Sequence, residues 1–250
     1  MKDQLYQYIL GIADNSLILG QRLGELCGHG PSLETDIALT NISLDLLGQV
    51  RNYYQYAAKI QGKEATEDSI AFLRKERDYR NVLLVEHPNT DFAYIITRAF
   101  FFDVYHEMFL ARLMKSTDET LAAVAAKSIK EVRYHKSFSA EWMKRLGDGT
   151  EESHARTQDA VDNLWRYTNE LFQPSDAEAA MAKTGIGVDV TTLKEGYYQA
   201  ITQILELATL KVPTNTWFQK GGKQGVHTEH MGYLLSDLQY MQRAYPNMNW

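Results

Sequence analysis

The scarcity of proline is the feature that most constrains the fold of this chain. The 250 residues include five prolines, at positions 31, 88, 174, 213 and 246, which leave long stretches without one. Proline is excluded from helix interiors because it lacks an N–H donor and its ring clashes with the preceding turn. Strand signals are nearly absent, since no turn sequence lies between alternating apolar runs. The sequence therefore predicts an all-α protein.

Four long segments carry an apolar stripe with alternate steps of three and four residues, the period of a helix face that packs against other helices. The stripes are Leu5, Ile9, Ile12, Ser16, Leu19, Leu23 and Leu26; Leu39, Ile42, Leu46, Gln49, Tyr53, Tyr56 and Ile60; Phe92, Ile96, Ala99, Asp103, His106, Leu110 and Leu113; and Leu121, Ala125, Ser128, Val132, His135, Ser139, Trp142 and Leu146. Helices of this length measure roughly 40 Å at 1.5 Å per residue. We expect a long four-helix bundle.

The bundle core should span residues 5–146, with a shorter connecting helix over residues 66–87. The segment GDGTEES, residues 147–153, is the best candidate for a linker. Beyond it we expect helices around residues 152–172, 190–210 and 227–243, packed on the outside of the bundle. Because periodic helical sequence resumes directly after the linker, we expect a single helical domain over residues 1–250.

Charge and composition exclude several classes of protein. A formal charge of −6 provides no basic surface, so nucleic acid is not an expected partner. The single cysteine, Cys27, excludes internal disulfides and multi-cysteine metal sites. No apolar run approaches the length of a membrane span, and the N-terminus lacks the apolar region of a signal peptide. We expect a cytoplasmic protein that does not bind membranes.

Polar residues interrupt the stripes near the middle of each predicted helix. They are Ser16, Gln49, Asp103, His106 and His135. Buried polar groups must be paired, and a buried carboxylate must be paired or bound to metal. A lone residue of this kind is usually satisfied within the core, but five at similar depth on four helices predict a shared polar centre. Ferritin-like proteins hold two irons at this position.

The ligands of a di-iron centre are mostly missing from this chain. Such a centre requires an acid from each of two helices and Glu-x-x-His from each of the other two. The segment IKEVRYHKSF places Glu131 four residues before His135, not three. Counting from His135, the six ligand positions are Ser16, Leu46, Gln49, Asp103, Val132 and His135. One carboxylate and one imidazole are too few for iron. We predict a vestigial site without metal, cofactor or catalytic residues, in which Asp103 and His135 contact each other or share a polar network.

Four segments of the chain resemble one family of proteins: ADNSLILGQRLGELCGH, NISLDLLGQVRN, KSIKEVRYH and GGKQGVHTEHMG. They are similar to the C-subunit family of bacterial phenylacetyl-CoA epoxidases, and the similarity covers essentially the whole chain. The resemblance implies a ferritin-like fold and a structural, non-catalytic role. It also implies a homologous catalytic subunit that contains the di-iron centre, with further small subunits and a reductase. That partner has Glu and His where this chain has Leu46 and Gln49, and again where it has Val132 and His135.

By this resemblance, the complex epoxidises the aromatic ring of phenylacetyl-CoA with O₂ in aerobic phenylacetate catabolism. Two alternatives remain. One is an active di-iron oxidase or iron-binding protein with ligands in another register, using Glu131, Asp45 and His106. The other is a module that binds CoA thioesters.

Two C-terminal motifs have structural explanations. The segment HTEH, with His227, Glu229 and His230, lacks a third convergent metal ligand, so we expect it to cap a helix or contact a partner. The glycine-rich segment 221–225 departs from the phosphate-binding pattern and should form a flexible loop or a docking turn.

Asp45, beside the second stripe, should pair with Arg51 or with a neighbouring helix.

Aromatic residues exceed what one seam per helix requires. We expect about half of them to cover the bundle and the rest to bind the catalytic subunit. The set comprises Tyr53, Tyr54, Phe100, Phe101, Phe102, Tyr197, Tyr198, Trp217 and Phe218.

Overall fold

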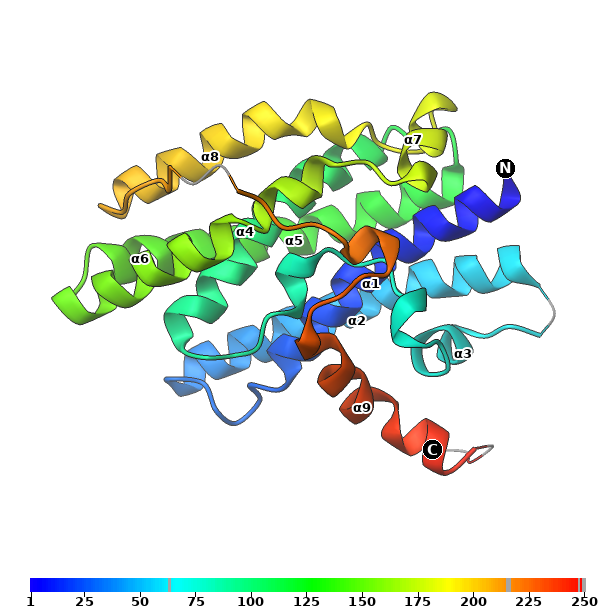
Figure 1. The fold of residues 1–250 in the computed structure, drawn as a ribbon, viewed down its shortest axis with the longest axis horizontal. Coiled ribbons are helices and arrows are strands. Elements are labelled where there is room, and N and C mark those ends of the chain that lie inside the picture. Colours follow the sequence, from blue (N-terminus) through cyan, green and yellow to red (C-terminus); the bar gives the residue numbers. More distant parts are fainter. Residues whose placement is uncertain (63, 215–216, 247, 249–250) are drawn as a thin grey trace.

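The computed structural model describes residues 1–62, 64–214, 217–246 and 248, and every regular element in these ranges is helical. Four long helices dominate the fold: α1 (Lys2–Gly24), α2 (Leu33–Gln61), α4 (Phe92–Leu113) and α5 (Glu119–Gly147) (Figure 1). The predicted all-α bundle is therefore confirmed. That residues 1–250 form one domain stays a prediction, and the end of that range, including Trp250, lies outside the described residues.

The long helices pack as two hairpins. Helix α1 packs most extensively against α2, and α4 against α5, whereas α2 and α5 meet over a smaller area. Side-chain caps fix three of the helix starts, because an oxygen of Ser32, Asp91 or Asp118 accepts a backbone N–H of the first turn.

The connection between the hairpins is not the single helix predicted over residues 66–87. It contains α3 (Glu67–Phe72) and two 3₁₀ turns, Glu76–Asp78 and Leu83–Glu86. Its backbone N–H groups bond to side chains of α1: Arg80 N donates to Asp14 at 2.8 Å, and Val82 N donates to Asn15 at 2.8 Å. These donors are therefore not available for helical bonds within the segment.

The segment after the bundle is helical, as predicted. It forms α6 (Glu151–Trp165), a 3₁₀ turn (Thr168–Phe172), α7 (Asp176–Lys183), a 3₁₀ turn (Val190–Leu193), α8 (Lys194–Leu207), a 3₁₀ turn (Gly222–Gln224) and α9 (Glu229–Ala244). The short helix α7 was not anticipated. The expected linker is a tight turn between α5 and α6, where a Cβ on Gly147 would lie 2.3 Å from the carbonyl oxygen of Ala208.

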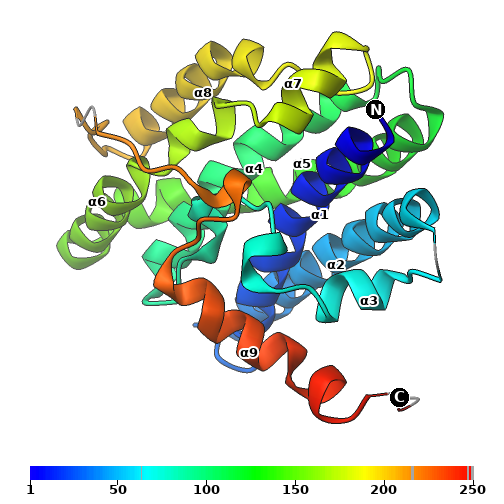
Figure 2. The same ribbon diagram turned by 45° about the vertical axis from the view of Figure 1, so that its right-hand side comes forward.

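The added helices cover the bundle unevenly. Helices α6 and α8 pack on α4 and α5, and α7 packs on α1. Helix α9 makes its main contacts with α3 and the Glu76–Asp78 turn. It points away from the bundle in both views (Figure 2). None of the helices in the described ranges combines the length and apolar character needed to cross a membrane.

Candidate functional site

The six vestigial ligand positions lie in the centre of the bundle. Helices α1 and α4 each contribute one of them, and α2 and α5 each contribute two. All six are at most 2% exposed: Ser16, Leu46, Gln49, Asp103, Val132 and His135. The six positions are therefore buried and are distributed over the four long helices.

Asp103 and His135 do not pair with each other. The Oδ2 of Asp103 accepts a hydrogen bond from the Ser139 hydroxyl at 2.8 Å, and His135 Nε2 lies 3.1 Å from Asp45 Oδ2. The predicted direct contact is wrong because Asp45, a half-exposed residue beside the seam, reaches inward to His135. Arg51, the other partner considered for Asp45, lies 3.7 Å from Glu67 instead.

The protonation of this centre reflects its burial. Burial raises the pKa of Asp103 to about 7, and the Ser139 hydrogen bond opposes this only in part. Burial, and secondarily the nearby His135, lowers the pKa of His106 to about 3, so this imidazole is neutral at physiological pH. No cation partners Asp103 among the described residues.

The alternative ligand set is not assembled either. Glu131 accepts a hydrogen bond from Gln49 Nε2 at 3.0 Å, and Asp45 is engaged by His135. His106 lines a separate small cavity on the α1 side. Within the described part of the chain, no group of three or more His, Cys, Asp or Glu residues could hold a metal ion.

The chemistry of the donor set argues against a pair of irons at the six positions. Leu46 and Val132 have aliphatic side chains that cannot ligate metal, yet they occupy two positions where glutamates are required. Carboxylate oxygens provide the anionic donors of such sites, and Asp103 is the one carboxylate present. The residues at the six positions do not fit a di-iron centre.

The centre has nevertheless stayed polar. Six of its buried side-chain atoms have no hydrogen-bond partner among the described residues: Ser16 Oγ, Gln49 Oε1, Tyr53 OH, His106 Nδ1, Ser128 Oγ and His135 Nδ1. A buried polar atom left without a partner costs about 1–3 kcal/mol. The core at these positions is therefore not wholly apolar.

The HTEH segment forms a structural junction. Thr228 is the N-cap residue of α9, as expected, although its side chain makes no cap hydrogen bond. His227 Nδ1 lies 2.6 Å from Glu86 Oε1, and both Thr228 N and Thr228 Oγ1 donate to Glu86 Oε2. Burial lowers the pKa of His227, but the hydrogen bond and charge of Glu86 outweigh it and raise that pKa above 6.5. The ring of His230 lies 5.9 Å from that of His87.

The 221–225 turn is packed, so its interpretation as a flexible loop is wrong. Lys223 is 7% exposed, and its Nζ contacts both carboxylate oxygens of Glu178 at 3.0 Å. A Cβ on Gly222 would lie 2.1 Å from the carbonyl oxygen of Asn81. The carboxylate of buried Glu170 joins this turn to the hairpin connection, because it accepts Gly221 N and Leu83 N, each at 2.8 Å.

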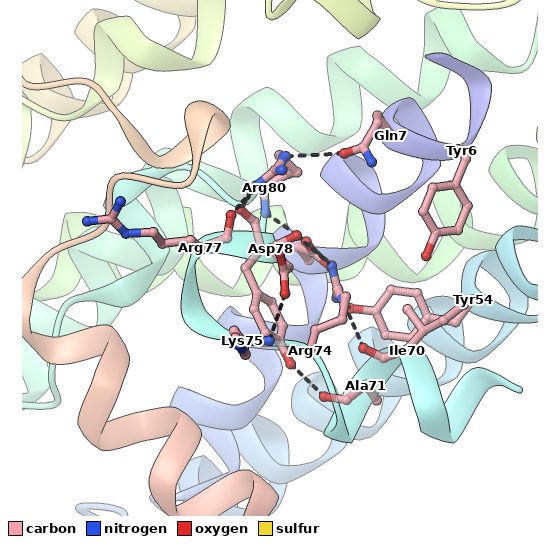
Figure 3. A network of polar contacts seen from close by, with 12 residues as sticks. Tyr6, Gln7, Tyr54, Ile70, Ala71, Arg74, Lys75, Arg77, Asp78 and Arg80 are labelled. Carbon is pink, nitrogen blue, oxygen red and sulfur yellow. Dashed lines mark hydrogen bonds and ion pairs between the residues drawn. The ribbon is translucent and has the colours of Figure 1, made fainter. Parts of the chain in front are cut away.

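A buried ion pair that sequence reasoning missed joins α1 to the hairpin connection. The guanidinium of Arg74 contacts both oxygens of Asp14, at 2.6 and 3.0 Å, and Tyr54 OH donates to Asp14 Oδ1 at 2.5 Å. Figure 3 shows Arg74 beside Tyr54, with Arg80 bonded to Gln7 next to them. Asp14 lies within an apolar stretch of α1, and a carboxylate in such a stretch indicates a buried charged partner.

Comparison with known proteins agrees with the helical fold. The model of the family described as "Phenylacetic acid catabolic protein" matches residues 1–250. A curated relative, the C subunit of the 1,2-phenylacetyl-CoA epoxidase of Escherichia coli (strain K12), is 48% identical over 248 residues, which cover 99% of this chain and 100% of the relative. The resemblance drawn from the four sequence segments is confirmed, and the chain belongs to the phenylacetic acid catabolic protein family.

Proposed function

We propose that this chain is the non-catalytic structural subunit of a multicomponent di-iron monooxygenase that epoxidises the aromatic ring of phenylacetyl-CoA. It binds and stabilises a homologous catalytic subunit, and further small subunits and a reductase complete the complex. Membership of the phenylacetic acid catabolic family supports the pathway, and similarity to the C subunit of a 1,2-phenylacetyl-CoA epoxidase supports the complex.

The observation that carries the non-catalytic role is the pair of aliphatic residues at the centre of the bundle. Leu46 and Val132 are fully buried on the two helices that would supply the Glu-x-x-His motifs. Oxygen activation at a di-iron centre requires carboxylates there. A bundle with this substitution keeps the shape of a catalytic homologue without its metal ligands, which is the character of a structural partner.

The expected division of the aromatic residues requires correction. Tyr53, Tyr54 and Tyr197 are at most 1% exposed, as are the three consecutive phenylalanines 100–102. These side chains form the core and cannot bind a partner. Tyr198 and Phe218 are partly buried, and Trp217 alone of the set is largely exposed, at 56%. More than half of the set therefore belongs to the buried core.

Other apolar side chains offer surfaces for a partner. On α9, Tyr233 is 75% exposed and Tyr240 is 61% exposed, two turns apart on one face. On the bundle, Leu44 of α2 is 60% exposed and Tyr134 of α5 is 52% exposed, on helices that contact each other over a small area. Permanent partners bury roughly 2,000 Å² or more, with an apolar centre. We assign these two surfaces to contact with the catalytic subunit.

The test is to mix the pure chain with a homologous catalytic subunit and determine the mass of the product by light scattering. We expect a stable complex in which turnover of phenylacetyl-CoA exceeds that of the catalytic subunit alone. Leu44→Glu and Tyr240→Glu should each weaken the complex. Leu207→Glu, at a 63% exposed position on the far end of α8, is the matched control.

Two results would contradict the proposal. The first is separate elution at micromolar concentration together with equal turnover by the catalytic subunit alone. The second is stoichiometric iron in the pure chain that survives dialysis, which would favour the di-iron oxidase alternative.

A further inference from the structure

A polar cleft opens on the side of the molecule formed by α1, α7 and the 221–225 turn. It has a volume of about 360 Å³. Four amide side chains line it, together with Arg80 and several groups at the start of α7: Gln4, Gln7, Asn15 and Gln224. A lining of this kind favours water over an apolar ligand, because each amide needs hydrogen-bond partners.

A second, smaller cavity continues the cleft toward the centre of the bundle. Its volume is about 20 Å³, and four of its residues also line the cleft: Tyr8, Gly11, Asn15 and Glu178. At its inner end it is bounded by Phe102 and His106 of α4. The two spaces therefore adjoin each other, and the inner one reaches His106, one of the buried polar residues of the bundle.

The inner cavity has the size and chemistry of a site for one water molecule. A volume of about 10–15 Å³ is sufficient for a water, which needs two to four polar partners. Tyr8, Asn15, Glu178 and His106 provide polar groups around this space. The Nδ1 of His106 is buried and has no partner in the described part of the chain.

We propose that this cavity binds one water molecule that hydrogen-bonds to His106 and exchanges with solvent through the polar cleft. This site is separate from the partner surfaces proposed above, and it exists in the isolated chain. It takes water and no larger ligand because of its volume. The proposed water lies beside His106 in the cavity that α1 lines.

Gly11 lines both spaces. It is in the interior of α1, where glycine weakens a helix relative to alanine. A Cβ at this position would meet only the Cβ and carbonyl oxygen of Arg80, each at 3.9 Å, which is ordinary contact. No steric constraint therefore demands glycine here, whereas a long side chain would enter the passage.

The test is oxygen-17 magnetic relaxation dispersion of water, which counts long-lived internal waters and measures their residence times. We compare the wild-type chain with His106→Phe, Gly11→Leu and the control Gly11→Ala. His106→Phe should lose the contribution of one internal water, while Gly11→Ala keeps it. Gly11→Leu should keep the water but lengthen its residence time at least tenfold.

Equal dispersion amplitudes for the wild type and His106→Phe would overturn the proposed water site. An unchanged residence time in Gly11→Leu would overturn the proposed route. A high-resolution crystal structure of the wild-type chain tests the site without any variant. It should show a water within about 3.2 Å of His106 Nδ1, and a dry cavity there would refute the proposal.

Discussion

Replacing Asp103 with asparagine should change how the stability of the chain depends on pH. Burial raises the pKa of Asp103 from 3.8 to about 7. Because the folded-state value lies above the unfolded one, the stability that this group contributes is fully present below pH 3.8 and is lost as the pH rises through about 7. Asparagine cannot ionise, but its side-chain oxygen can still accept the Ser139 hydroxyl.

The magnitude follows from the two pKa values. One pKa unit corresponds to about 1.4 kcal/mol, so the wild type should lose about 2.5 kcal/mol at this site between about pH 5 and about pH 8. Asp103→Asn should not show this loss. Its free energy of unfolding, relative to that of the wild type, should therefore rise by about 2.5 kcal/mol over the same interval. Other titrating groups are common to both proteins and cancel in the difference.

The assay is urea denaturation followed by circular dichroism across this pH interval. Asp237→Asn, on the exposed face of α9, is the matched control and should run parallel to the wild type at every pH. If the Asp103→Asn difference is equally constant, Asp103 is not an unpaired buried carboxyl. The reasoning from its burial and its single hydrogen bond would then be wrong.

Two further predictions concern the C-terminal segment. Lys223→Met should lower the free energy of unfolding by about 3–5 kcal/mol, because it leaves the Glu178 carboxylate without its buried partner; Lys220→Met, at an exposed position, should change it little in the same denaturation experiment. His227→Gln should destabilise the chain most below pH 6.5, where the wild-type imidazolium faces Glu86. The difference should shrink as the pH rises through the raised pKa of His227, and thermal melts over a pH series would show a constant difference if the pair contributes nothing.

The four long helices and the burial of the six central positions could be predicted because burial of a helix face imposes a period on the sequence. Leu46 and Val132 fall on that period and are fully buried. The partner of His135 could not be predicted in the same way. Asp45 lies beside the seam, and its contact depends on how far a side chain reaches across two helices, which periodicity does not encode.

The hairpin connection was mispredicted for a related reason. Its backbone donors bond to Asp14 and Asn15, whose positions precede it by more than 60 residues. Local helix propensity does not account for hydrogen bonds between backbone N–H groups and side chains that are distant in the sequence. Helix α7 is different, because Ser175 and Glu178 form a capping box that was visible in the sequence. The buried phenylalanines 100–102 follow from helices α6 and α8, which cover a second face of α4.

The position of the two buried carboxylates, Glu86 and Glu170, has a consequence for how the chain matures on the ribosome. Their partners in the 221–228 segment emerge long after the bundle helices, which can fold during synthesis. Until that segment arrives, burying either carboxylate would leave a negative charge without its full set of donors in an apolar interior. The two sites must therefore stay hydrated while translation continues. We expect the 221–228 segment to complete the burial of both carboxylates when it docks.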